Sequence, residues 1–332
     1  RRKTPRHKSY APWHDATMML EGDAARMLGE LGRTRWRRAG GGDLEPVEAP
    51  EESAWPEDLV EQFTDVEIGI SRTRAAYDGT DAISEIEQLF LLHIARAKHF
   101  IYAESQYFAS RKIGEAISKR LQEDDPPEIV IVQPLHAEDW IEELAMDSAR
   151  ARLVNSLREI DHKGRLHFFV PYTGETPIYC HAKIMIVDDE VLRIGSANLN
   201  NRSLGLDTEC DVFIDCARPA NRDCGPTIRS LRHSLLAEHC GLEQEDVGPL
   251  LEQYGSMAAM IEAKGGGAGR SLRPLQPEPP SEMEKALADS EVLDPETPEE
   301  MFDLIKSRRG LFRRGSLLSR AKARLQRKRK RR

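Results

Sequence analysis

The 332-residue chain is long enough for one large α/β domain or two small ones, and 39% apolar residues suffice for a sizeable core. Its longest apolar runs are strand-sized, far below the ~20 residues of a membrane span, which excludes a transmembrane helix. The net charge of −8 hides an asymmetry, because residues 306–332 hold 14 Lys or Arg and no acid, whereas residues 1–305 carry a net charge of −22. This acidic body argues against a nucleic-acid partner, while the tail favours an anionic one.

The apolar spacing predicts a strand over residues 12–20 and a helix over 22–38, followed by a solvated linker over 43–64. Strands and helices then alternate, with strands at 65–73, 98–104, 128–133 and 165–170 and helices at 81–97, 111–122 and 138–159. This alternation predicts an α/β fold in which a mixed sheet is flanked by helices on both faces.

Three further strands, at 180–187, 191–194 and 210–215, read as the centre of the sheet, and a helix at 225–239 closes the globule. We therefore expect a folded catalytic unit over residues 65–245. Residues 246–332 are expected to form a tail, first rich in Pro and Glu and then polybasic, that is disordered or helical.

Five cysteines form an odd set without a CxxC pair. This cysteine pattern favours reduced thiols and a cytoplasmic location. The sequence opens on Arg1 and Arg2 without the apolar stretch of a signal peptide. The missing initiator Met suggests that the natural N-terminus is absent. A zinc site is the alternative use of the cysteines, but Cys210 and Cys216 lack paired ligands at finger spacing, so no metal or cofactor is expected.

One stretch carries chemistry: His181 and Lys183 precede an apolar run ending at Asp188, and Gly195, Ser196 and Asn198 follow. Alternate residues of a strand share one face, so the imidazole and the ammonium should project together, roughly 7 Å apart. A turn at 195–196 can bring the amide of residue 198 beside them. An imidazole, a cation and an amide suit a phosphodiester, although a His-x-Lys pair alone is more often a solvated strand face.

The stretch resembles the phospholipase D superfamily, whose signature HxKx4Dx6GSxN is matched at every fixed position. Residues 101–108 (IYAESQYF) look like the family's IENQYF strand, with Ser105 where Asn is usual. Residues 12–15 (PWHD) look like the segment after the first signature in phospholipid-cleaving members. Residues 1–42 would then be the end of a first phospholipase D-like half, and the resemblance covers roughly residues 10–240.

The resemblance implies a phosphohistidine intermediate, in which one histidine attacks phosphorus and a second protonates the leaving alcohol. His181 resembles the second histidine, and Asp15 would fix its tautomer. Glu209 would orient the opposite histidine, while the place of Asp188 past the buried run suggests that it holds the turn. The implied catalytic set is His181, Lys183, Asn198, Glu209, Asp188 and Ser196, and the implied substrate-binding set is Glu104, Gln106, His14 and Asp15.

No second HxK occurs in the chain. Either the chain is the C-terminal part of a two-signature enzyme, or two copies assemble one site across a two-fold axis. In both cases a missing N-terminal half or a second copy is the required partner.

The tail, residues 306–332, has the spacing of a basic amphipathic helix and could dock the protein on an anionic membrane surface. A solubilising tail or a nucleic-acid arm are the alternatives. The resemblance favours a phospholipid substrate and a peripheral location at the inner membrane surface. A cardiolipin synthase-like transferase, a superfamily nuclease and a non-catalytic membrane-binding remnant remain the competing readings.

Overall fold

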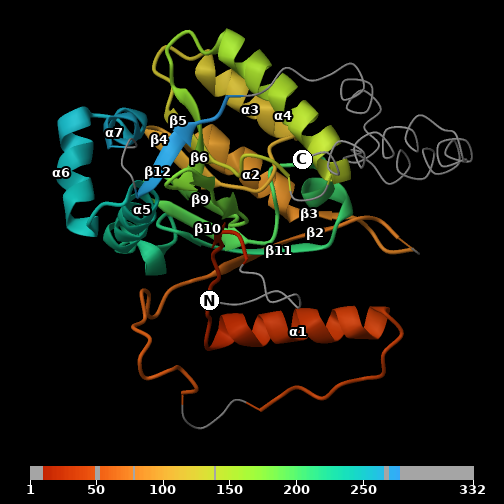
Figure 1. The fold of residues 1–332 in the computed structure, drawn as a ribbon. Helices are drawn as coiled ribbons and strands as arrows, with labels where there is room; N and C mark the ends of the chain where they lie inside the picture. The colour runs from red at the N-terminus through yellow and green to blue at the C-terminus, as the bar shows by residue number, and fades with distance from the viewer. Residues whose placement is uncertain (1–9, 49–52, 78, 138–139, 265–268, 277–332) are drawn as a thin grey trace, which may run out of the picture.

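A computed structural model describes residues 10–48, 53–77, 79–137, 140–264 and 269–276. Within these residues a 10-stranded mixed sheet has the order β12-β6-β5-β4-β9-β10-β11-β2-β3, with β7 paired to β6. Strands β4, β5 and β6 are parallel to one another, and the strands on either side of them pair antiparallel. The α/β fold with a mixed sheet is therefore confirmed (Figure 1).

The strands of the sheet are β2 (Gly69–Arg74), β3 (Ile83–Ser84), β4 (Phe100–Glu104), β5 (Glu128–Val132), β6 (Leu166–Thr173), β7 (Thr176–Pro177), β9 (Ile184–Val187), β10 (Val191–Gly195), β11 (Glu209–Asp215) and β12 (Arg270–Pro274). Two short strands, β1 (Trp13–His14) and β8 (Tyr179–Cys180), pair in parallel as a separate ladder. The helices are α1 (Asp23–Arg38), α2 (Glu85–Arg96), α3 (Arg111–Leu121), α4 (Trp140–Ile160), α5 (Gly225–Cys240), α6 (Gln244–Tyr254) and α7 (Met257–Lys264), with short helical turns at Arg202–Leu206 and Pro219–Asn221.

Both faces of the sheet are covered, as the continuous apolar strands require. Helices α2, α3 and α4 pack on one face and α5, α6 and α7 on the other (Figure 1). Strand β4 shows why: Ile101 and Ala103 belong to the first apolar cluster, and Tyr102, which points the opposite way, belongs to the second. Helix α1 lies outside these layers and buries none of its side chains.

The expected boundary at residue 245 is wrong. Residues 246–276 are folded where described, because Val247, Met257 and Leu272 fill the second apolar cluster and β12 extends the sheet beside β6. Among the described residues of the expected linker, 43–48 and 53–64, there is no helix or strand. The polybasic tail, residues 306–332, lies outside the described residues.

Two expected strands are also corrected. The strand predicted over 12–20 is reduced to Trp13–His14. The strand predicted over 180–187 is two strands, because residues 179–180 pair with β1 and residues 184–187 pair with β4 and β10. His181, Ala182 and Lys183 form the crossing between these two pairings. No helix in the described part of the chain combines the length and apolar character needed to cross a membrane.

Candidate active site

His181 lies at the crossing between β8 and β9, beside strand β1. Its backbone N–H donates to the carbonyl of His14 (2.8 Å), and its Nδ1 lies 2.9 Å from Oδ2 of Asp15. Burial opposes the charged form of Asp15, but the hydrogen bonds from His181 and the backbone N–H of Ala16, together with the charges of His181 and Lys183, outweigh it and lower the pKa of this carboxyl. A carboxylate only accepts, so Nδ1 carries the proton and Nε2 is free to act on a substrate.

Lys183 brings a positive charge to the same place. Its side chain is mostly buried, and Nζ donates to Oε1 of Gln106 (3.2 Å) and to the carbonyl of His181. Burial lowers the pKa of Lys183 to about 8, although the negative charges of Asp15 and Glu209 act in the opposite direction. The amine is therefore charged at neutral pH but close to losing its proton.

Asn198 is joined to Lys183 through Gln106. The Asn198 carbonyl Oδ1 accepts from the backbone N–H of Gln106 (3.1 Å) and from Oγ of Ser105 (3.3 Å). This fixes the amide by its oxygen, so its NH2 group is the part left to contact a ligand. Ser105, which replaces the usual Asn, also accepts from the backbone N–H of Leu199 (3.1 Å) and so holds the segment that carries Asn198.

Glu209 begins β11 and is held by Ser196, whose Oγ donates to the Glu209 carboxylate and accepts from the backbone N–H of Cys210 (3.1 Å). Burial raises the pKa of Glu209, and hydrogen bonds from Ser196 and Ser203 oppose that rise. Ser196 thus contacts Glu209 rather than His181. The role of Glu209 in orienting a second histidine stays a prediction.

The turn at Gly195 packs against the buried ion pair of Arg193 and Asp211, which the sequence did not predict. Asp211 accepts from the backbone N–H groups of Ser196 (2.9 Å) and Ala197 (3.1 Å) and pairs with the buried guanidinium of Arg193. A Cβ at Gly195 would lie 1.8 Å from the Asp211 carboxylate, so only glycine fits there.

Replacing Asp211 by alanine should lower the free energy of unfolding by about 3–5 kcal/mol, because it strands the Arg193 guanidinium without its partner. Urea unfolding of the two proteins measures this loss. Asp23→Ala, which removes an exposed ion pair with Arg26, is the control and should leave stability unchanged. Equal stability of the Asp211 and Asp23 variants would show that the turn does not depend on the buried pair.

The catalytic role implied for Asp188 is corrected to a structural one. Its carboxylate accepts from three consecutive backbone N–H groups, those of Lys98 (2.6 Å), His99 (2.8 Å) and Phe100 (2.8 Å). It lies beyond the far end of β9, roughly 15 Å from Lys183 along an extended chain. Asp188 therefore fastens the β9–β10 turn to the start of β4, which fits its place past the buried run.

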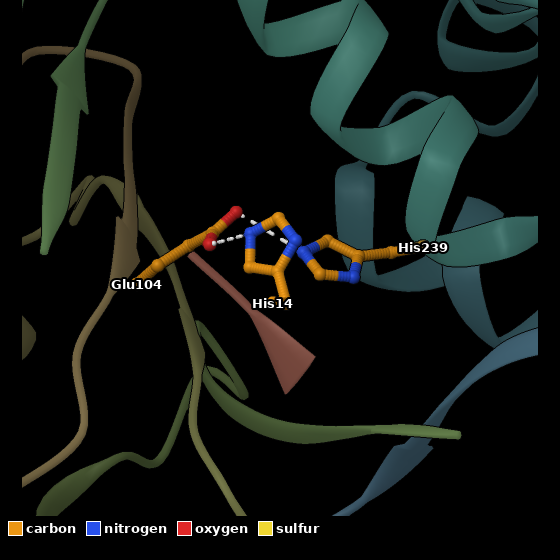
Figure 2. A group of neighbouring side chains, drawn as sticks. All are labelled: His14, Glu104 and His239. Carbon is orange, nitrogen blue, oxygen red and sulfur yellow. Dashed lines mark hydrogen bonds and ion pairs between the residues drawn. The ribbon is translucent and has the colours of Figure 1, made fainter. Parts of the chain in front are cut away.

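The substrate-binding roles implied for Glu104 and His14 are also corrected. Both are almost fully buried, and His14 Nε2 donates to Glu104 Oε2 (2.6 Å). Glu104 accepts further hydrogen bonds at Oε1 from Tyr102 (2.6 Å) and from His239 Nε2 (3.1 Å). Figure 2 shows this cluster, in which side chains from β1, β4 and α5 meet. A substrate cannot reach groups that are enclosed and already hydrogen-bonded in this way.

The cluster should make stability depend on pH. Burial lowers the pKa of His14, but hydrogen bonds to Glu104 and Glu238 raise it to about 10. A pKa raised above the unfolded value of 6.5 gives stability that is complete below pH 6.5 and lost as pH rises through about 10. Urea unfolding at pH 6 and pH 10 should show the wild-type advantage over His14→Gln shrinking by a few kcal/mol. A constant difference between the two proteins would mean that His14 is neutral in the fold.

His239 was missed because a lone histidine in the last turn of a helix carries no local signal. The sequence predicts no role for Trp13, although its ring stacks on Tyr179 (4.6 Å between centroids) and lies near His181 (5.3 Å). Tyr179 holds Gln106, whose Nε2 donates to its hydroxyl (2.8 Å). The structure therefore brings together His181, Asp15, Lys183, Gln106, Asn198, Ser196 and Glu209, and places Asp188, Glu104 and His14 elsewhere.

Comparison with known proteins finds similarity to phospholipases D. The family model described as Phospholipase D matches residues 169–263. Phospholipase D alpha 1 of Zea mays is 26% identical over 327 residues, covering 70% of this chain and 40% of its own length. Phospholipase D zeta 1 of Arabidopsis thaliana is 29% identical over 227 residues, covering 52% of this chain and 21% of its own length. Together with the complete signature, these matches support a relationship to the phospholipase D superfamily.

Among solved structures, phosphatidylserine synthase of Haemophilus influenzae matches with a TM-score of 0.36 and 17% identity, over 59% of this chain and 47% of that one. Nuc of Salmonella typhimurium, described as a phospholipase D family member, matches with a TM-score of 0.31 and 16% identity, over 45% of this chain and 82% of that one. The chain spans about 40% of the length of the alpha-type curated relatives it matches.

Proposed function

We propose that this chain supplies one half of the active site of a phospholipase D-type phosphodiesterase that cleaves or transfers phospholipid headgroups. The observation that carries the proposal is the hydrogen bond between His181 Nδ1 and Asp15, beside the amine of Lys183. It supports a histidine with a fixed tautomer next to a cation, which is the arrangement that acid catalysis at a phosphodiester requires.

In the proposed reaction a histidine from outside the described site attacks phosphorus. His181 passes the proton on Nε2 to the leaving alcohol, which breaks the P–O bond and leaves a phosphohistidine. His181 then takes a proton from water or from an acceptor alcohol, whose oxygen displaces the first histidine. Lys183 and the NH2 group of Asn198 bind the phosphoryl oxygens, on which negative charge accumulates.

The experiment uses the full-length protein with a short-chain phosphatidylcholine and measures released choline. We expect turnover that is lost in His181→Ala. Hydrolysis of single-stranded DNA without any hydrolysis of phosphatidylcholine, phosphatidylethanolamine or phosphatidylglycerol would instead establish the nuclease reading. The curated relatives favour the lipid substrate, since their names are those of phospholipases D.

The source of the second histidine is a separate part of the proposal. We favour an upstream first signature, because residues 12–15 contribute Asp15 to this site and resemble the segment that follows such a signature. Mass spectrometry of the native gene product tests it: a longer protein with an upstream HxKx4D is expected. An active dimer of 37.5 kDa chains would establish instead that two copies share the site.

We further propose that residues 306–332 dock the protein on an anionic surface of the inner membrane. With 14 basic residues and no acid, each engaged residue can contribute about 1 kcal/mol near anionic lipid. Co-sedimentation with vesicles containing phosphatidylserine should fall at least tenfold when residues 306–332 are removed. Equal binding of both proteins would remove this role for the tail.

A further inference from the structure

The carboxylate of Glu104 contacts both chain segments that carry the Asp15–His181 pair. Its Oε2 accepts from His14 Nε2 (2.6 Å), and the Sγ of Cys180 lies 3.8 Å from the same oxygen. His14 and Cys180 face each other in the β1–β8 pairing, and each directly precedes one member of the pair. One buried carboxylate therefore touches the two residues whose chain neighbours meet at the candidate active site.

Strand β1 is short, and besides His14 it is held by Trp13, which stacks on Tyr179, and by the nearby Ala16 and Met18, which pack against the second apolar cluster. It is two residues long, and the backbone bonds that flank its pairing with β8 run from Tyr179 N–H to the Pro12 carbonyl (3.0 Å) and from His181 N–H to the His14 carbonyl (2.8 Å). Over residues 10–22, all of which the structure describes, His14 alone is buried. Alternation along the strand then directs Trp13 and Asp15 to the side of His181. His14 therefore attaches this segment to the core through its hydrogen bond with Glu104.

The His14–Glu104 attachment is an ionised pair at neutral pH. Burial disfavours the charged form of Glu104, but its electrostatic interaction with His239 and the hydrogen bonds from His14 and His239 hold its pKa well below the usual range. The second nitrogen of His14, Nδ1, lies 3.3 Å from Glu238 on α5, and Glu238 in turn pairs with Arg270. A buried ion pair with both partners hydrogen-bonded fixes geometry strongly, because breaking it leaves an unpaired buried charge.

The His14–Glu104–His239 cluster also offers three atoms that a metal ion could bind, all within 4.8 Å of one another. The hydrogen bonds of Glu104 instead indicate that protons on His14, Tyr102 and His239 occupy the positions where a metal ion would bind. Oε2 of Glu104 accepts from His14, and Oε1 accepts from Tyr102 and His239, so both oxygens are satisfied by donors in place. The cluster is therefore a hydrogen-bonded core that joins β1 to β4 and α5 (Figure 2).

We propose that Glu104 is a positioning residue for the reaction: by holding His14 it fixes strand β1, and so keeps the Asp15 carboxylate against Nδ1 of His181. This inference rests on the proposed function, in which the protonated Nδ1 leaves Nε2 available to the leaving alcohol. Glu104 acts through Asp15 and does not itself touch the substrate.

The kinetic test is Glu104→Gln in the full-length protein with a short-chain phosphatidylcholine. We expect kcat to fall about 100-fold, the size of a displaced catalytic group, with KM unchanged. Glu128→Gln is the matched control, because Glu128 is also a buried carboxylate but accepts from Ser256, Met257 and Ala258 at the start of α7. It should lose stability and keep kcat. A similar loss of kcat in both variants would overturn the proposal.

A double-mutant cycle separates positioning from general damage. Asp15→Asn already removes the group that Glu104 positions, so adding Glu104→Gln to it should lower kcat no further. Glu104→Asp should restore part of the lost kcat because it keeps the charge. Independent, multiplicative losses in the double variant would show that Glu104 does not act through Asp15.

A readout without turnover distinguishes failure of this inference from failure of the proposed function. Histidine ring 15N NMR of the wild type should show neutral His181 as the Nδ1–H tautomer, while Glu104→Gln should show a mixture of tautomers and Glu128→Gln should not. An unchanged tautomer in Glu104→Gln would overturn the inference. A tautomer change in a protein that cleaves no phospholipid would support the positioning and refute the function. One equivalent of tightly bound metal in the purified protein would also overturn the hydrogen-bonded cluster.

Discussion

Replacing His181 by alanine in the full-length protein should lower kcat on phosphatidylcholine by about 10²–10⁴-fold, the usual range for loss of a general acid and base. The hydrogen bond from Nδ1 to Asp15 commits the other nitrogen, Nε2, to the proton transfer. The loss should therefore depend on the leaving group. A substrate whose leaving group needs no proton, such as a p-nitrophenyl phosphodiester, should still form the phosphohistidine, which then persists because no base activates water.

Acid quenching followed by mass spectrometry of the labelled peptides measures that adduct. His162→Ala is the control, since His162 is exposed in the loop after α4 and its variant should match the wild type in both rate and adduct. If the His181 variant forms no adduct with the activated substrate while the wild type does, His181 is the nucleophile and the assignment of the two histidines is reversed.

The layered fold followed from local patterns because each strand carries its own signature. Strand β5 is buried on both faces and reads as an unbroken apolar run, and β4 alternates side chains between two apolar clusters. Residues 246–276 were misjudged for the opposite reason. Val247, Met257 and Leu272 are spaced among charged and glycine-rich stretches, and their burial depends on strand β6 and helix α5, which no local window contains.

The break inside residues 180–187 has a similar cause. Their sequence reads as one strand, but residues 179–180 pair with residues 13–14, more than 160 positions away, and residues 184–187 pair with β4 and β10. The crossing between the two pairings is where His181 and Lys183 lie. The signature pointed to these two residues from local sequence alone, whereas the backbone shape that brings them together depends on long-range pairing.

The roles of the acidic residues also divide into those that local sequence predicts and those that depend on distant partners. Asp15 and Glu209 were assigned from a resemblance and lie beside Lys183, close enough for their charges to act on its pKa. Glu104 resembled a substrate-binding residue because it stands in a recognisable segment. Its partner His239 is 135 positions away, and this distance in sequence hides the cluster that encloses it.

Lys183 should impose an alkaline limit on activity. Burial lowers its pKa to about 8, so the ammonium that binds phosphoryl oxygens is present below that pH and is lost as pH rises through it. Lys183→Gln should lower kcat/KM about 10²–10³-fold, the cost of one group that stabilises the transition state. Lys183→Arg keeps its charge at every accessible pH, so the decline above pH 8 should disappear even if the absolute rate is lower.

Profiles of kcat/KM between pH 6 and pH 10 measure this effect, with Lys112→Gln as the control, since Lys112 forms an exposed pair with Glu87. The same alkaline decline in the wild type and in Lys183→Arg would assign the limit to another group.

The stability of a Lys183 variant gives an independent check. A lysine with a pKa lowered by burial weakens the fold at neutral pH, so Lys183→Met should raise the free energy of unfolding by about 1–3 kcal/mol while activity falls. Opposite changes in stability and activity are expected of a charge that is held in place for chemistry, whereas a structural lysine would lower both when removed.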